Sequence, residues 1–306
     1  MRTAFIDELC KLAENDPSIW LVCGDLGYSV LEQFSDRFPD RYLNAGVAEQ
    51  NMTGIAAGLA LEGKTVFTYS IANFPVMRCL EQIRNDVCCH NLKVKIVSIG
   101  GGLAYGSHGY SHHGVEDLGV MRCLPNMKVV APGDPIEARA AVRAMAADIG
   151  PGYLRLGKAG EKILHSGPVE FEFGRAIPVL KGSQVMIFST GGTLGIALDA
   201  AGDLQAAGLS VAMSSMPSLA PIDRDAILDA ARTVELVVTV EEHGPGGLGS
   251  AVAEVMAESG LSTRLRMVRL RHEILKIAGT QDFLRASLGV SREHLVNSVL
   301  SVLRPT

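Results

Sequence analysis

RYLNAGVAEQNMTGIAAGLALEGK, residues 41–64, places a carboxylate at Glu49, just before a helical stretch rich in small side chains. Residues such as Gly54, Ala57 and Gly58 let a helix backbone pack closely against its neighbours. A glutamate beside such a helix can be a desolvated acid/base carboxyl. It can also be a residue at a helix start that the helix dipole stabilises. Spacing alone favours this second, structural interpretation.

Helical and strand signals alternate on both sides of this stretch, up to residue 156. Apolar residues at helical spacing mark a first helix: Phe5, Ile6, Leu9 and Leu12. Apolar runs predict strands at 18–25, 66–70 and 93–99. Further helices are predicted at 74–89 and after a Pro-Gly-Asp turn within 127–147, where Asp134 is the expected N-cap. This alternation is typical of a mostly parallel sheet covered by helices, so we predict an α/β domain over residues 1–156.

A turn-rich segment without a sustained helical face follows at residues 157–182, and we interpret it as a linker. Beyond it, apolar strands are predicted at 184–190, 209–215, 234–242 and 263–270, separated by helices at 194–206, 227–232 and 249–258. Residues 183–306 are therefore predicted to form a second, smaller α/β domain. The expected fold class is α/β with two domains rich in parallel sheet.

Composition narrows the possible partners and locations. Hydrophobic residues make up 47% of the 306-residue chain and charged residues 20%, an apolar excess that we interpret as buried subunit interface. The net charge is −5 and the basic residues are scattered, which argues against a nucleic-acid or anionic-membrane partner. The N-terminal region lacks the pattern of a secretion signal, so we expect a cytoplasmic protein. The six cysteines lie in the first half at no metal-type spacing and are expected to be reduced core residues.

Three histidines lie in the glycine-rich segment GGLAYGSHGYSHHGVED, residues 101–117. Polar loops on rigid scaffolds often carry function, which makes His108, His112 and His113 candidates for a site. A zinc site is the competing interpretation. Because His112 and His113 are adjacent and point apart, and no cysteine or carboxylate completes a usual ligand set nearby, we disfavour zinc and predict no metal ligands in this chain.

Three ordered segments, at residues 38–52, 74–87 and 106–138, resemble those of transketolases and deoxyxylulose-phosphate synthases. The similarity runs over nearly the whole chain and is stronger up to about residue 158. It implies a pyrimidine-binding domain followed by the family's C-terminal domain, with thiamine diphosphate as the cofactor. The implied activity is transfer of a two-carbon ketol unit between sugars or sugar phosphates.

The resemblance also implies roles for individual residues. Glu49 matches the glutamate that hydrogen-bonds the cofactor's aminopyrimidine and favours its reactive imino tautomer. Phe74 is the candidate for the aromatic platform under the pyrimidine, with Tyr69 as the second choice or a core residue. His112 matches a catalytic histidine that contacts the donor sugar near its carbonyl, and His108 stands where the family has an aspartate that reads a sugar hydroxyl.

Four positions match the family's sugar-phosphate site: Arg2, Ser29, Gly100 and Lys158. Arginine and serine are kept, lysine replaces an arginine, and glycine replaces a histidine, so phosphate binding is expected but weakened. Arg155 is an additional cation that can serve there or at an interface.

Three further features have weaker assignments. Asp25 matches an acidic residue near the cofactor, although a turn aspartate at a strand end fits equally well. The glycine-rich segment 244–249 is expected to serve structure or an interface, and His243 to be a polar cap rather than a catalyst.

The family holds the diphosphate and Mg²⁺ through a Gly-Asp-Gly motif and a later Asn-Asn pair in a separate N-terminal domain, and this chain has neither. The resemblance therefore implies a partner chain, the N-terminal transketolase subunit, in an α2β2 heterotetramer that binds Mg²⁺ mainly through the partner. The alternatives are the β subunit of the first component of a 2-oxo-acid dehydrogenase, a deoxyxylulose-phosphate synthase, and a non-catalytic assembly subunit. The three quoted segments favour transketolase.

Overall fold

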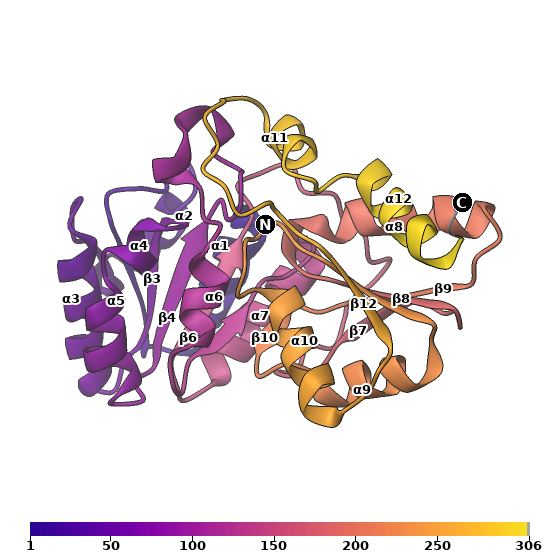
Figure 1. The fold of residues 1–306 in the computed structure, drawn as a ribbon. Coiled ribbons are helices and arrows are strands. Elements are labelled where there is room, and N and C mark those ends of the chain that lie inside the picture. The colour runs from indigo at the N-terminus through magenta and orange to yellow at the C-terminus, as the bar shows by residue number, and fades with distance from the viewer. Residues whose placement is uncertain (305–306) are drawn as a thin grey trace.

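A computed structural model describes residues 1–304, which form two α/β halves packed side by side (Figure 1). The first sheet has seven strands in the order β10-β5-β6-β4-β3-β1-β2, all parallel except β10, which runs antiparallel to β5. Its strands are β1 (Ile19–Cys23), β2 (Tyr42–Asn44), β3 (Thr65–Ile71), β4 (Val94–Ile99), β5 (Lys128–Val130), β6 (Gly152–Leu156) and β10 (Ser218–Ala220). The α/β prediction is confirmed for this half.

Helices cover both faces of this sheet because its central strands are apolar on both sides. Phe67 of β3 packs with α1 and α7, whereas Val66 points to the other face and packs with α3. The helices of this half are α1 (Arg2–Asn15), α2 (Glu32–Ser35), α3 (Glu49–Leu61), α6 (Asp117–Arg122) and α7 (Pro135–Ala147), with short 3₁₀ turns η1 (Pro39–Arg41), η3 (Gly106–His108) and η4 (Tyr110–His112). Asp134 caps α7 by accepting the N–H groups of Ile136 and Glu137, as predicted.

Residues 74–89, predicted as one helix, form three short helical pieces instead. These are α4 (Phe74–Met77), α5 (Leu80–Gln82) and a π-helical turn, η2 (Ile83–Cys88). Cys79, at φ −110° and ψ 9°, leaves the helical conformation and separates α4 from α5. Such π-helical turns occur frequently at functional sites.

The second sheet has five strands in the order β12-β11-β8-β9-β7, parallel except for β7. Its strands are β7 (Ile177–Leu180), β8 (Val185–Ser189), β9 (Val211–Ser215), β11 (Leu236–Val240) and β12 (Arg264–Val268). Its helices are α8 (Leu194–Ala206), α9 (Arg224–Thr233), α10 (Leu248–Ser259), α11 (Gln281–Ser287) and α12 (Arg292–Leu303), with the 3₁₀ turn η5 (Gly191–Thr193) before α8.

The structure corrects the predicted linker at residues 157–182, because β7 lies inside it and pairs antiparallel with β9. A four-residue edge strand that contains Pro178 gives no long apolar run, which is why its sequence pattern is weak. The two halves are also interleaved: β10, which lies within the second half of the chain, completes the edge of the first sheet. One hydrophobic cluster therefore contains residues of α3 together with residues of α9 and α10.

Two further observations concern the chain as a whole. Among residues 1–304, none of the helices is both long and apolar enough to cross a bilayer. All six cysteines are free thiols; four are buried, in agreement with the prediction, whereas Cys89 and Cys123 are exposed.

Candidate active site

The carboxyl ends of the parallel strands in the first sheet carry most of the predicted site residues. Asp25 follows β1, Phe74 follows β3 and Lys158 follows β6. The histidine loop, which we define as residues 100–116, follows β4, and Glu49 begins the helix after β2. Open parallel sheets bind their ligands outside the carboxyl ends of the strands. The fold thus gathers residues that are far apart in the sequence at the edge where ligands bind.

Glu49 is a buried carboxylate, with 4% of its surface exposed, at the first position of α3. The helix dipole favours a negative charge there. Nη1 of Arg78 donates to both carboxylate oxygens, Oε1 and Oε2, at 3.0 Å. Since the Arg78 side chain is 47% exposed, the carboxylate is buried yet reached by a group that is partly in solvent.

Phe74 presents its ring face to the same guanidinium. The Arg78 Cζ atom lies 3.9 Å from the ring centroid, a stacked cation–π arrangement. The edge of the ring contacts His112, with the two ring centroids 5.1 Å apart and an interplanar angle of 62°. The structure therefore brings Glu49, Phe74 and His112 into one place.

The histidine loop is closed at its base by two backbone hydrogen bonds between Gly102 and Gly114. The rings of His108 and His112 lie 5.1 Å apart on its exposed side. Burial, and then the charges of His108 and Arg78, lower the pKa of His112 below its usual value. His112 is therefore neutral near pH 7 and can donate from one ring nitrogen and accept at the other.

Tyr105 fills the space that a side chain at position 100 would take. Gly100 has φ +74°, and a Cβ atom added there would overlap the Tyr105 ring. Lys158 Nζ lies 4.6 Å from the centroid of the same ring. Burial raises the pKa of Tyr105, and the nearby charge of Arg2 partly offsets this effect. Lys158 thus lies over an aromatic ring whose pKa the charge of Arg2 partly lowers, where the resemblance implied a histidine.

Asp25 and Ser29 belong to a partly exposed turn after β1, and both have positive φ, +57° and +61°. The Asp25 carboxylate accepts hydrogen bonds from the Asn44 side chain at 2.9 Å and the Tyr28 hydroxyl at 3.3 Å. Its backbone N–H donates to the Asn44 side chain. These contacts fit the turn interpretation of Asp25. Ser29 donates its N–H to Glu32 and makes no hydrogen bond to Arg2 or Lys158 within the described part of the chain.

The structure corrects the second-choice platform, Tyr69. Side chains alternate along a strand, so Tyr69 and Phe67 point to the face of the sheet that packs against α1, opposite to α3 and Glu49. The Tyr69 ring is 2% exposed and packs 5.9 Å from the ring of Phe5. Tyr69 is therefore a core residue, the other role that the sequence allowed.

Arg155 is buried in a charged network, with 7% of its side chain exposed. Its Nε lies 3.2 Å from Oδ2 of Asp117, and its Nη2 donates to the Gly114 carbonyl at 2.7 Å. Asp117, fully buried, also accepts a 2.5 Å hydrogen bond from the Tyr153 hydroxyl. His243 lies against the same carboxylate, with Nε2 3.7 Å from Oδ1. This network supports the base of the histidine loop from below.

His243 is expected to make the fold sensitive to acid. Burial lowers its pKa to about 4, even though Asp117 opposes the shift. Between pH 6.5 and 4 the unfolded chain therefore binds more protons than the folded one, so this residue's contribution to stability is complete above 6.5 and is lost as the pH falls toward 4. The full contribution is on the order of 3 kcal/mol.

The measurement is urea unfolding from pH 7.5 to 4.5 at fixed protein concentration, comparing wild type with His243→Asn. Burial also raises the pKa of Glu241 to about 7, an opposite contribution that both proteins share. The stability gap between them should narrow as the pH falls. A difference in unfolding free energy that stays constant with pH would disprove the role of His243 in acid sensitivity. The exposed His272→Asn variant is the control and should follow wild type at every pH.

The glycine-rich segment 244–249 makes a structural contact within the chain. The backbone N–H groups of Leu248 and Gly249, at the start of α10, donate to the two carboxylate oxygens of Glu241 at 2.6 and 2.8 Å. A protein carboxylate therefore already binds the helix N-terminus that a phosphate would need. His243 acts in the same region as a buried polar contact: its Nδ1 lies 2.9 Å from the Gly244 carbonyl, and its Nε2 accepts from Gly119 N–H at 3.3 Å.

Three residues at or near this site gave no usable sequence signal. Arg78 lies within a predicted helix, Tyr105 is one aromatic in a loop, and Glu242 follows a buried strand. Each acquires its role from a contact with a residue distant in the sequence, or, for Arg78, from the break in the helix that carries it. The one available signal was the run of glycines at 100–102: Gly100 has a positive φ, and its missing side chain leaves the space that Tyr105 fills.

Comparison with known proteins gives the class of the chain. The sequence model described as "Transketolase, pyrimidine binding domain" matches residues 1–160, and "Transketolase, C-terminal domain" matches residues 174–295. The chain belongs to the transketolase family, whose members depend on thiamine diphosphate.

Individual relatives are similar over nearly their whole length. The chain is 36% identical over 270 residues to one subunit of the apulose-4-phosphate transketolase of Actinobacillus succinogenes, covering 88% of this chain and 87% of the relative. It is 35% identical to a putative transketolase C-terminal section of Methanocaldococcus jannaschii, covering 99% and 96%. A solved structure described as a split gene transketolase, inactive beta4 tetramer, matches with a TM-score of 0.90 and 38% identity, covering 99% and 97% of the two chains.

Proposed function

We propose that this chain is the C-terminal subunit of a split, thiamine-diphosphate-dependent transketolase, which transfers a two-carbon ketol unit between sugars or sugar phosphates when a partner chain holds the diphosphate and Mg²⁺. The observation that supports it best is the buried carboxylate of Glu49, placed beside the ring of Phe74 at the ligand-binding edge of a parallel sheet. The names of the relatives, two of which are single subunits or sections of transketolases, favour the same reaction.

The contacts of Arg78 support the fit of an aminopyrimidine to these residues. Its guanidinium is a flat group that stacks on Phe74 and donates N–H bonds to Glu49. An aminopyrimidine is likewise flat and can stack on an aromatic ring while a ring nitrogen hydrogen-bonds a carboxyl. We propose that the guanidinium stands in for that ring and moves aside when the cofactor binds.

When bound, thiamine diphosphate supplies the electron sink for breaking a carbon–carbon bond next to a carbonyl. Within this chain, Glu49 holds a proton at a pyrimidine nitrogen, in a position shielded from water. His112, neutral near pH 7, can hydrogen-bond the donor sugar near its carbonyl. His108, 5.1 Å from His112, would donate to a sugar hydroxyl where an aspartate would accept.

Replacing Arg78 by methionine should tighten cofactor binding by the assembled complex. In the variant the cofactor no longer has to displace the Arg78–Glu49 ion pair. Because the arginine of this pair is half exposed, the pair contributes about 1 kcal/mol or less, so we expect the Kd to fall by at most about fivefold. Calorimetric titration with thiamine diphosphate and Mg²⁺ measures it. Arg84→Met, at an exposed position of the same segment, is the control. Weaker binding would show instead that Arg78 helps to hold the cofactor.

We propose that the substrate carries an anionic group at the end away from the carbonyl. Arg2 and Lys158 both lie near Tyr105, and neither forms an ion pair with a carboxylate in residues 1–304. Two unpaired cations suit a phosphate, and the name of one relative includes a phosphorylated sugar. Ser29 and Asp25 remain part of this proposal as neighbours of the substrate and the cofactor.

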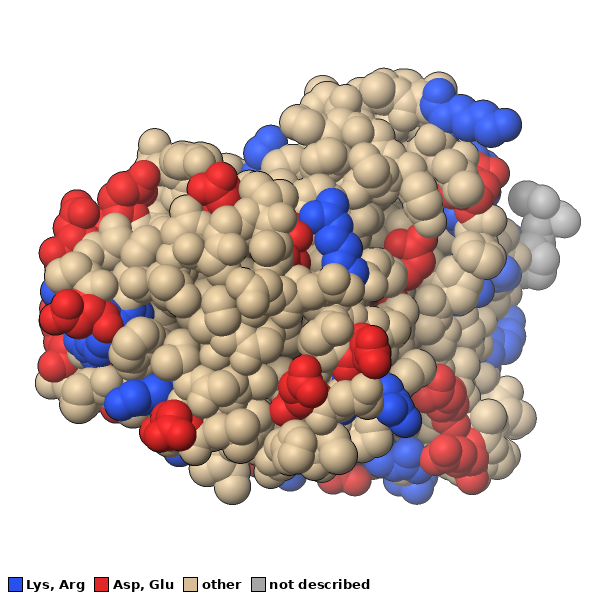
Figure 2. Space-filling view, turned by 90° about the vertical axis from the view of Figure 1, so that its left-hand side faces the viewer, with Lys and Arg blue, Asp and Glu red and all other residues tan. Residues whose placement is uncertain are grey.

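The proposed assembly is an α2β2 heterotetramer in which the cofactor lies between chains. We propose that Mg²⁺ is bound mainly through the partner, because this sequence lacks the Gly-Asp-Gly and Asn-Asn motifs with which the family holds it. Several apolar side chains of the first half are exposed, including Leu61 of α3 at 66%, Val47 just before α3 at 73%, and Tyr28 in the turn after β1 at 73%. Figure 2 shows this side of the molecule, where a broad surface of uncharged residues lies between the charged ones. Obligate interfaces are apolar, and this face is our candidate for one.

Reconstitution distinguishes the reactions. The chain is mixed with its partner, thiamine diphosphate and Mg²⁺, and then given either a ketose phosphate with an aldose acceptor or a 2-oxo acid. Ketol transfer without CO₂ release is expected. Release of CO₂ from the 2-oxo acid would support the 2-oxo-acid dehydrogenase alternative, and no turnover of either substrate would favour a non-catalytic subunit.

A further inference from the structure

The histidine loop rests on the second half of the chain along its inner side. Its backbone is held there at two points: the Val115 carbonyl accepts from Gly244 N–H at 2.8 Å, and Leu103 N–H donates to Oε1 of Glu242 at 2.8 Å. The Leu103 side chain also belongs to an apolar cluster with Leu270, Leu284, Leu288 and Val290.

Glu242 is the carboxylate at the centre of this contact. Its side chain is 6% exposed and accepts three further hydrogen bonds from α11: Gln281 Nε2 lies 3.0 Å from both oxygens, and Arg285 Nη2 lies 2.7 Å from Oε2. Its backbone carbonyl accepts from Arg155 Nη2 at 2.9 Å. A buried carboxylate with this many donors is fixed in position. It therefore connects α11 rigidly to the backbone of the histidine loop.

Gly102 shows how closely the loop approaches this carboxylate. It has φ +68°, a left-handed conformation that favours glycine, and a Cβ atom added there would overlap the Glu242 side chain. Gly106 is equally close to α11 and the segment before it, since its added Cβ would lie 2.6 Å from the Gly279 carbonyl oxygen and from Leu284. Two glycines thus allow the loop to lie directly on its support.

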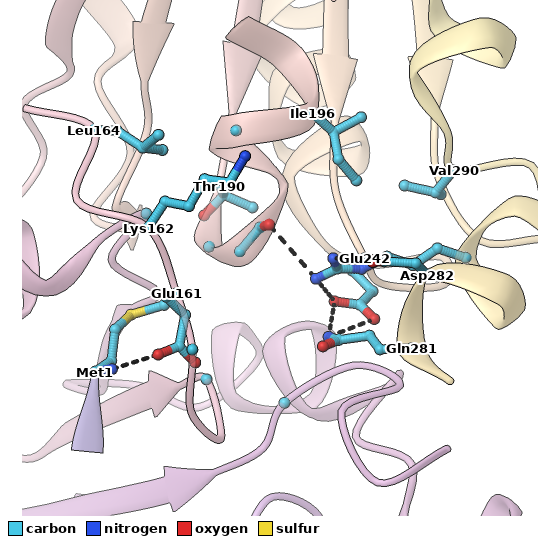
Figure 3. Close-up of a pocket in the computed structure, with 18 of the residues that line it drawn as sticks. Met1, Glu161, Lys162, Leu164, Thr190, Ile196, Glu242, Gln281, Asp282 and Val290 are labelled. Carbon is cyan, nitrogen blue, oxygen red and sulfur yellow. Dashed lines mark hydrogen bonds and ion pairs between the residues drawn. The ribbon is translucent and has the colours of Figure 1, made fainter. Parts of the chain in front are cut away.

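A cavity of about 570 Å³ borders Glu242 (Figure 3). Glu242, Gln281 and Arg285 form part of its wall, and Figure 3 shows the bonds that join Glu242 to Gln281. The carboxylate therefore borders open space on this side. On this side its position is set by the ion pair with Arg285, at 2.7 Å, rather than by filled space behind it.

We infer that Glu242 is a positioning residue: through its bond to Leu103 N–H it sets the conformation of the histidine loop, and so the placement of His108 and His112 at the donor sugar. The inference rests on the proposed function only for this last step. The conformation of the histidine loop can be measured in this chain without its partner. Glu242 acts without contacting the substrate, and the second half of the chain thereby shapes a site that lies at the edge of the first sheet.

The test compares Glu242→Ala with two controls. Gln281→Ala removes another donor from the same carboxylate but leaves the Leu103 bond, and Val299→Ala, a fully buried position in α12, destabilises the second half elsewhere. Hydrogen–deuterium exchange of the full chain is followed by mass spectrometry. Loss of a buried hydrogen bond should speed exchange of the peptides covering residues 100–116 by about tenfold or more in Glu242→Ala alone.

The reconstituted enzyme then gives the second readout. In Glu242→Ala the apparent KM for the ketose donor should rise about tenfold, because a smaller fraction of loops is in the competent conformation, while the Kd for thiamine diphosphate stays unchanged. Both controls should keep the wild-type KM. Unchanged loop exchange, or a loosened loop with an unchanged donor KM, would overturn the inference. Failure of the proposed function would be seen earlier and separately, as absence of ketol transfer in wild type.

Discussion

Replacing Glu49 by glutamine is expected to lower kcat of the reconstituted enzyme by about 10³-fold, within the range that positioned acid/base groups contribute. Glutamine keeps the size of the side chain and can still accept the Arg78 hydrogen bond. It cannot hold and release a proton at the pyrimidine nitrogen. Because the residue is buried, water cannot easily take over that role. The loss should therefore appear in kcat, with the assembly of the two chains unaffected.

Steady-state ketol transfer, with assembly checked by light scattering, measures this effect. Glu62→Gln is the matched control, since Glu62 is an exposed glutamate at the C-terminal end of the same helix. It should leave kcat unchanged. If Glu49→Gln and Glu62→Gln both retain wild-type activity, Glu49 is not the catalytic carboxylate of this chain.

Replacing Asp117 by alanine should lower the free energy of unfolding by about 3–5 kcal/mol, the usual cost of removing one partner from a buried ion pair. The change would leave the Arg155 side chain, which is 7% exposed, without its carboxylate. It would also remove the acceptor of the Tyr153 hydroxyl, which is fully buried. Both groups would then lie in the interior with unsatisfied polar atoms.

Urea unfolding of the chain at fixed concentration measures this loss. Asp225→Ala is the control: that carboxylate is 80% exposed and pairs with an exposed Arg175, so its removal should cost about 1 kcal/mol or less. Equal effects of the two substitutions would mean that the network beneath the histidine loop contributes no more than a surface pair.

The parts of the fold that the sequence predicted well are those determined by local patterns. The periodicity of α1, the Asp134 cap of α7 and the apolar runs of the central strands are all properties of adjacent residues. Strand β7 was missed because an edge strand of four residues needs only partial burial, and its register depends on β9. Helices α11 and α12 follow a segment without clear periodicity and were not predicted.

The candidate site was predicted in part. Glu49, Phe74 and His112 were proposed from the resemblance to transketolases, and the structure places them together. The role of Tyr69 could not be predicted without knowing which face of the sheet its side chain points to. A shift of one residue along a strand reverses that direction. Arg78, Tyr105 and Glu242 contact Glu49, Lys158 and Leu103 across 29, 53 and 139 residues of chain, and no periodic pattern predicts such contacts.

We propose that this chain supplies the activating carboxylate to a cofactor held by another chain. Exchange of the C2 proton of thiamine diphosphate for deuterium, followed by NMR in the presence of Mg²⁺, measures this activation directly. We predict exchange near the rate of the free cofactor with the partner chain alone, much faster exchange when this chain is added, and a return to the slow rate with Glu49→Gln. Fast exchange with the partner alone, or with Glu49→Gln, would contradict the claim.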